Sequence, residues 1–243
     1  SSLLGPWDRL ALAVDTERDS VNFRLFDPGR ALVWTEGQGT SPVILTTWPR
    51  PDPQIRGILD SLSVSSETLA SGFRLHSLSA GNLLGTEFPE VCAPGSTDMG
   101  NGGHQHRFDN GLELTTACWL KGSAVGSEAE MVLLTAWAVV APLDLPEMPI
   151  VANPPPPGTY TGPRLAVFAH LLPPNANSAG LEQSNRQSIE DDGLWVDPLT
   201  LSPGDRFIQI HRFDTDRTAA TGPYTVRLGL YDPMTGERHA VLD

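Results

Sequence analysis

The chain has 243 residues, of which 40% are hydrophobic and 19% charged, the composition of a globular protein able to bury a substantial core. Its 29 acidic residues outnumber 16 basic ones, and the net charge of −13 would repel phosphate backbones and anionic membrane surfaces. We therefore expect no nucleic-acid partner. The longest apolar stretch, Met131 to Leu143, is shorter than the roughly 20 residues of a membrane helix, so no membrane span is expected.

The first fifth of the chain contains short apolar runs, the later ones separated by turn residues such as Asp-Pro-Gly and Gly-Gln-Gly. This pattern predicts short strands at residues 10–14, 21–26, 31–34 and 42–47. No secretory signal is visible at Ser1 to Leu4, and we expect a processed terminus or a piece of a longer protein.

One helix is predicted over residues 53–62. Its apolar residues stand at positions 55, 58, 59 and 62, the spacing of one helical face, and Pro53 suits the first turn. A second, weaker helix is predicted at Ser66–Ala70.

The turn-rich segment 87–103 has little periodicity and predicts a division of the chain near residue 100. Residues 1–100 would form a smaller α/β or strand-rich part. The strands predicted after the division cover residues 112–119, 130–140, 165–172, 207–213 and 224–231. Because no helices separate these strands, we predict a mainly β fold with an antiparallel, jelly-roll-like β-sandwich over residues 104–243.

Two cysteines, Cys92 and Cys118, flank a Gly-rich stretch. They form either a disulfide, if the compartment is oxidising, or two free buried thiols. The sequence leaves both states open.

A possible metal site is formed by His104, His106 and Asp109. Two imidazoles at positions i and i+2 lie on one face of a strand, and a nearby carboxylate can share a transition metal with them. The pattern is similar to the cupin metal motif, but it needs further ligands from another strand. Solvated histidines at a loop edge are the alternative.

Candidate ligand-binding residues are aromatic or acidic. Trp195 and Tyr231 can stack on sugar rings if they are exposed on a sheet, whereas Trp137 is expected in the core. Asp191 and Asp192, next to Glu190, can supply oxygen ligands to calcium, although solvated acidic turns are the simpler interpretation, as they are for residues 214–216.

The sequence contains no G-x-S-x-G, H-E-x-x-H or phosphate-binding Gly-Lys-Ser/Thr motif. We therefore predict no catalytic residue and expect that this chain alone is not an enzyme.

The C-terminal half carries a succession of turn and core motifs. A strand containing Phe168-Ala169-His170-Leu171 is followed by Asp191-Asp192-Gly193, by Pro203-Gly204-Asp205, and finally by the run from Gly222 to Arg238 (GPYTVRLGLYDPMTGER). This succession resembles the extracytoplasmic C-terminal β-sandwich domain of bacterial polyprenyl-phosphate-sugar-dependent membrane glycosyltransferases, in the mannosyltransferase-like superfamily. The resemblance covers about residues 104–243 and, more loosely, residues 20–75.

The resemblance implies architecture more than chemistry, because the motifs are turn and core elements. It implies a non-catalytic accessory domain, located outside the cytoplasm at the bacterial envelope, that contacts a glycan or lipid-linked sugar beside a membrane glycosyltransferase. Two alternatives remain open: an independent carbohydrate- or protein-binding subunit of an envelope complex, and a cupin-like metal-dependent enzyme.

Overall fold

The computed structural model describes residues 24–35, 43–47, 51–69, 74–78, 91–93, 105–121, 130–146, 162–172, 188–215 and 224–242. Within these ranges the chain is mainly β and its strands pair antiparallel, which confirms the predicted mainly β class with antiparallel sheets. No helix among them is long and apolar enough to cross a membrane.

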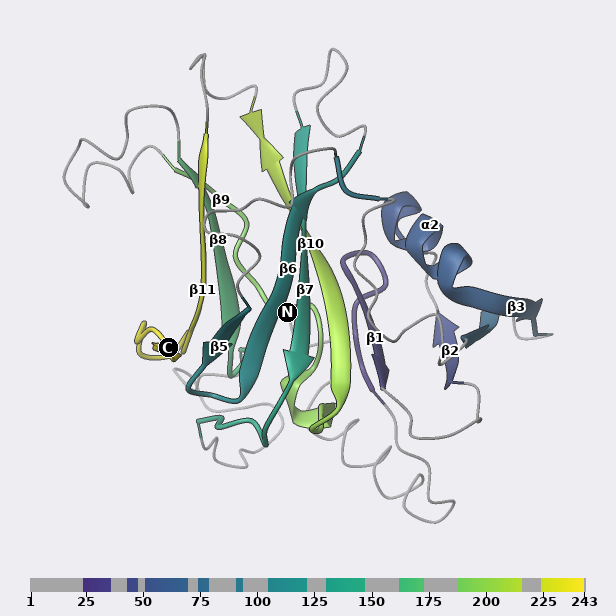
Figure 1. Cartoon of the computed structure of the whole chain (residues 1–243), viewed down its shortest axis with the longest axis horizontal. Coiled ribbons are helices and arrows are strands. Elements are labelled where there is room, and N and C mark those ends of the chain that lie inside the picture. The colour runs from purple at the N-terminus through teal and green to yellow at the C-terminus, as the bar shows by residue number, and fades with distance from the viewer. Residues whose placement is uncertain are drawn as a thin grey trace.

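The largest sheet in the described residues has six strands in the order β1-β10-β7-β6-β5-β12 (Figure 1). Its strands are β1 (Ala31–Thr35), β5 (His106–Phe108), β6 (Leu112–Trp119), β7 (Glu130–Val139), β10 (Asp205–Asp214) and β12 (Val241–Leu242). β7 and β10 pair over almost their whole length at the centre of this sheet.

β1 lies before the division predicted near residue 100, yet all five of its residues pair with β10. Ala31 is opposite Gln209 and Thr35 is opposite Asp205. The two parts of the chain that the sequence separated therefore share one sheet. Strand pairing over a long sequence separation leaves no local pattern, and the turn-rich segment could not reveal it.

Two smaller sheets flank the six-stranded one. The first has the order β11-β8-β9 and the second the order β2-β4-β3. Their strands are β2 (Val43–Thr47), β3 (Ser63–Thr68), β4 (Arg74–Leu78), β8 (Ala166–Leu172), β9 (Ile189–Glu190) and β11 (Thr225–Tyr231). A short 3-10 helix, η2 (Pro198–Thr200), precedes β10.

Helix α2 spans Pro53–Leu62, the range predicted from the sequence. The Asp52 side chain accepts a hydrogen bond from the Gln54 backbone N–H and caps the helix, and Pro53 occupies the first turn, where no backbone donor is needed. Arg212 on β10 donates to Asp52 at 2.7 Å, which ties the start of the helix to the large sheet. The apolar face of the helix is buried.

The second predicted helix, at Ser66–Ala70, is wrong: residues 66–68 belong to strand β3, and Ala70 lies outside the described residues. Residues 66–68 are polar and exposed, so they offer no apolar face to hold a helix. Pairing with β4 gives their backbone hydrogen-bond partners instead.

The six-stranded sheet is covered on both faces. Helix α2 packs on one face in a cluster that also contains Leu32, Leu134 and Ile208. The sheet β11-β8-β9 covers the other face, where Val167 and Leu230 pack with Trp137 and other residues of the six-stranded sheet. The result is a sandwich-like arrangement, with β8, β9 and β11 on one side of the large sheet and α2 on the opposite side (Figure 1).

Of the two states that the sequence left open for the cysteines, the structure contains the disulfide. Cys92 and Cys118 are joined, and both are buried in the cluster beneath α2. Cys92 also forms an isolated bridge with Leu120, next to β6.

Candidate functional site

Strand β8 has two chemically different faces. Val167, Ala169 and Leu171 point inward and are buried, while Phe168 and His170 alternate with them and are only partly buried. Aromatic and titratable groups therefore lie on the side of this sheet that faces away from the large sheet.

Strand β11 extends that surface. Residues directly opposite in an antiparallel pair share a face, and Arg227 is opposite His170, Gly229 opposite Phe168 and Tyr231 opposite Ala166. We call the surface formed by Phe168, His170, Arg227 and Tyr231 the outer face.

The Phe168 ring lies directly over Gly229. A Cβ atom added at Gly229 would stand 2.4 Å from the ring, so no larger residue fits there without moving it. The ring centroid is 5.4 Å from that of His170 and 6.4 Å from that of Tyr231, and the Arg238 guanidinium lies 4.8 Å above it. The rings and the guanidinium form one contiguous surface.

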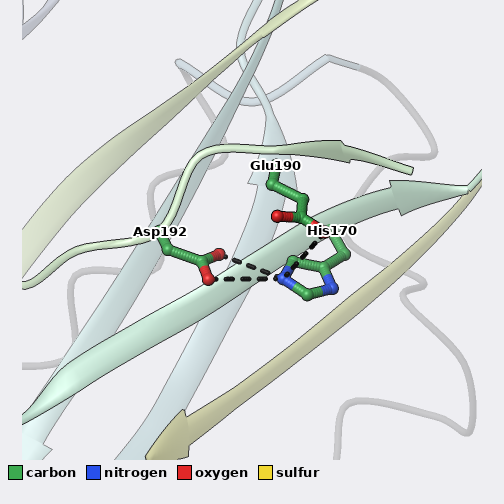
Figure 2. A group of neighbouring side chains, drawn as sticks. All are labelled: His170, Glu190 and Asp192. Atoms are coloured by element: carbon green, nitrogen blue, oxygen red, sulfur yellow. Dashed lines mark hydrogen bonds and ion pairs between the residues drawn. The ribbon is translucent and has the colours of Figure 1, made fainter. Parts of the chain in front are cut away.

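Two carboxylates from β9 and the residues after it reach His170 (Figure 2). Its Nε2 atom lies 3.2 Å from Asp192 Oδ1 and 3.9 Å from Glu190 Oε1. Glu190 is directly opposite His170 in the β8–β9 pair, and Asp192 follows two residues later, so both carboxylates point to the same side. Among the described residues, these three form the group that could hold a metal ion.

Asp191 points to the other side. Its carboxylate accepts hydrogen bonds from Arg30, at 2.6 Å, and from the Arg212 backbone N–H. The Arg30 guanidinium also lies 5.0 Å from the ring centroid of Trp195, which places a cation over that indole. Both Asp191 and Trp195 are thus held by Arg30.

A buried network fixes this segment to β10. The Gln209 side chain accepts from the Trp195 backbone N–H and donates to the Gly193 carbonyl and to His211 Nε2. His211 Nδ1 donates in turn to the Asp191 carbonyl at 2.8 Å. Each imidazole nitrogen therefore has one role, which is the pattern of a neutral histidine.

The electrostatics agree with a neutral ring at this position. Burial lowers the pKa of the His211 imidazole below its ordinary value of 6.5. The hydrogen bond to the Asp191 carbonyl and the nearby Asp191 charge oppose this effect but are smaller. The neutral His211 anchors the backbone from which Glu190 and Asp192 project.

The predicted ligand-binding residues are divided between two places. Tyr231 belongs to the outer face and Asp192 lies at its edge, whereas Asp191 and Trp195 face Arg30. Strand alternation separates the two neighbouring aspartates. Trp137 is 1% exposed in the core, as expected.

The predicted metal residues do not come together in the described part of the chain. His104 lies outside the described residues, and His106 is exposed on β5. Asp109 accepts a hydrogen bond from the Ala240 backbone N–H, and its Oδ1 lies 3.0 Å from His239 Nδ1. The group of three potential ligands includes neither His106 nor Asp109.

Sequence reasoning did not assign a role to Phe168, His170 or Arg238. A signal was present for the first two: within the strand predicted at residues 165–172, Phe168 and His170 stand at alternate positions among aliphatic residues. The contact of Arg238 with Phe168 depends on the turn after β11, and no sequence pattern indicates it.

Comparison of the chain with protein-family models, with curated proteins and with solved structures found no match.

Proposed function

We propose that this chain is a non-catalytic, extracytoplasmic accessory domain that contacts a glycan or lipid-linked sugar beside a bacterial membrane glycosyltransferase. The outer face is the proposed contact surface. The observation that carries the proposal is that aromatic rings, carboxylates and arginines gather there on one side of one small sheet.

The chemistry of this surface suits sugars. A sugar ring offers apolar C–H groups, which pack on aromatic rings such as that of Tyr231, and hydroxyl groups, which need donors and acceptors around the ring. Arg238 is exposed above Phe168 and supplies donors. Glu190, with a side chain 49% exposed, supplies acceptors.

Two further observations support the location and partner. The motif succession from Phe168 to Arg238 resembles the extracytoplasmic domain of membrane glycosyltransferases. The Cys92–Cys118 disulfide is of the kind that persists in oxidising compartments and is rare in a reducing cytosol.

A glycan array probed with the purified chain tests this function. We expect selective binding, reduced about 10-fold, or about 1.4 kcal/mol, by Arg238→Ala and by Tyr231→Leu. Arg107→Ala is the matched control, because Arg107 is also exposed but lies on β5 of the six-stranded sheet. The proposal fails if no glycan is bound selectively, or if the control reduces binding as much as Arg238→Ala.

A further inference from the structure

We infer that His170, Glu190 and Asp192 form a binding site for a divalent transition-metal ion of the zinc type. This site is distinct from the His-x-His group considered in the sequence. The proposed metal site does not depend on glycan binding, because it is argued only from the positions of the three side chains.

The spacing of the three groups suits one small ion. Ligands bound at about 2 Å in a tetrahedron are separated from each other by about 3.3 Å. His170 Nε2 is 3.2 Å from the nearer Asp192 oxygen and 3.9 Å from Glu190 Oε1, and the chosen ligand atoms all lie within 4.8 Å of one another. Glu190 is half exposed, so a small movement of its side chain closes the remaining gap.

Each ligand is already oriented by a second contact. The Ala169 backbone N–H donates to Asp192 Oδ1 at 3.0 Å, and the Ser188 hydroxyl donates to Glu190 Oε1 at 3.0 Å. The Phe168 ring packs beside the His170 imidazole. Such outer contacts position metal ligands and strengthen binding.

The types of ligand select the class of metal. An imidazole nitrogen suits zinc and its neighbours in the first transition row, whereas calcium takes six to eight oxygen ligands. One nitrogen and two carboxylates also neutralise a dication. Three protein ligands leave a fourth position of a tetrahedral ion for water or another oxygen.

The competing state is a direct contact between the His170 imidazole and the Asp192 carboxylate, with no metal. A second histidine–carboxylate pair provides the matched control for it. His239 Nδ1 lies 3.0 Å from Asp109 Oδ1, but no third ligand group accompanies that pair among the described residues. Zinc should therefore bind at the His170–Asp192 pair and not at the His239–Asp109 pair.

Calorimetric titration with zinc chloride at pH 7.5 tests the site, using the chelator-treated chain without a polyhistidine tag. We expect the parent chain to bind one zinc ion. The variants Asp192→Asn and Glu190→Gln should each bind zinc at least about 10-fold more weakly than the parent chain. Asp192→Asn keeps the oxygen that accepts from Ala169, and Glu190 is exposed, so both variants should keep the fold, which circular dichroism checks. His239→Asn should bind zinc like the parent chain.

The inference is overturned if the parent chain binds zinc no more tightly than the Glu190→Gln, Asp192→Asn double variant. It is also overturned if His239→Asn weakens binding as much as the ligand variants, or if calcium displaces zinc at equal concentration. Because the titration contains no glycan, its result does not decide the proposed sugar contact, and the glycan array does not decide the metal site.

Discussion

The six-stranded sheet and the sheet β11-β8-β9 use polar residues in opposite ways. In the first, β7 and β10 are covered on both faces, and their buried polar side chains, such as Thr135 and Gln209, make internal hydrogen bonds. In the second, the described part of the large sheet packs against one face, and His170 and Glu190 meet on the other face. A polar group between two layers serves the fold, whereas one on an open face is available to a ligand.

The largest difference in stability is expected between substitutions of Trp137, in the core, and of Tyr231, on the outer face. Trp137→Ala removes a fully buried indole stacked 6.2 Å from Phe207 and should lower the free energy of unfolding by about 3–5 kcal/mol. Tyr231→Ala, on the outer face, should cost clearly less. Urea unfolding of both variants measures this, and equal losses would contradict the comparison.

The next largest effect on stability is expected from removing the disulfide beneath α2. Replacing Cys92 and Cys118 together by Ala opens a link between residues 26 positions apart and should lower the free energy of unfolding by about 3.5 kcal/mol. Reduction of the parent chain should have a similar effect on its urea midpoint. Zinc binding at His170 should not change, since the disulfide lies on the opposite side of the large sheet; a lost zinc site would mean that the two regions are coupled.

A smaller effect is expected at Gly229. Gly229→Ala places a Cβ against the Phe168 ring and should cost about 1–3 kcal/mol while displacing the ring from the outer face. Gly57→Ala in α2 is the control, because its added Cβ meets no atom within 4 Å, and it should stabilise by about 1 kcal/mol. Thermal unfolding compares them, and a neutral Gly229→Ala would argue against the packing described.

The smallest predicted effect is a pH dependence from His211. Its folded pKa is lowered, so below pH 6.5 the unfolded state binds a proton that the folded state does not, and stability falls as the pH falls. The slope is at most about 1.4 kcal/mol per pH unit. Urea unfolding at pH 7.5 and 5.5 measures it.

The variant His211→Gln should reduce that slope without abolishing it. The pKa of His76 is also lowered, mainly by burial and to a smaller extent by the nearby Arg74 charge. His76 therefore also makes the folded state less stable as the pH falls. An unchanged slope in His211→Gln would mean that His211 is not the group responsible.

Local patterns predicted the elements well where burial follows one periodicity. The helix at 53–62 and the strand at 112–119 have the observed bounds, because one apolar helical face decides the first and apolar residues with strand alternation at its start indicate the second. The helix predicted at Ser66–Ala70 was wrong because its residues 66–68 face solvent, and pairing with β4 then decides their structure. β9 was missed because its two residues are too short to show a pattern.

The candidate site was only partly predictable. Asp192 and Tyr231 were identified from the sequence as residue types suited to binding. The contact between His170 and Glu190 could not be predicted, because it depends on the pairing of β8 with β9. Asp191 was predicted beside Asp192, and alternation along an extended backbone turned it toward Arg30 instead.

The sequence by itself determined the β class, the amphipathic helix and the absence of a long apolar segment, because each depends on residues close together in the chain. Only the tertiary structure decided that β1 joins β10, that the cysteines are bridged, and that His170 faces two carboxylates. These contacts join residues that are distant along the chain, and their pairing is set by packing between whole sheets, which no local periodicity encodes.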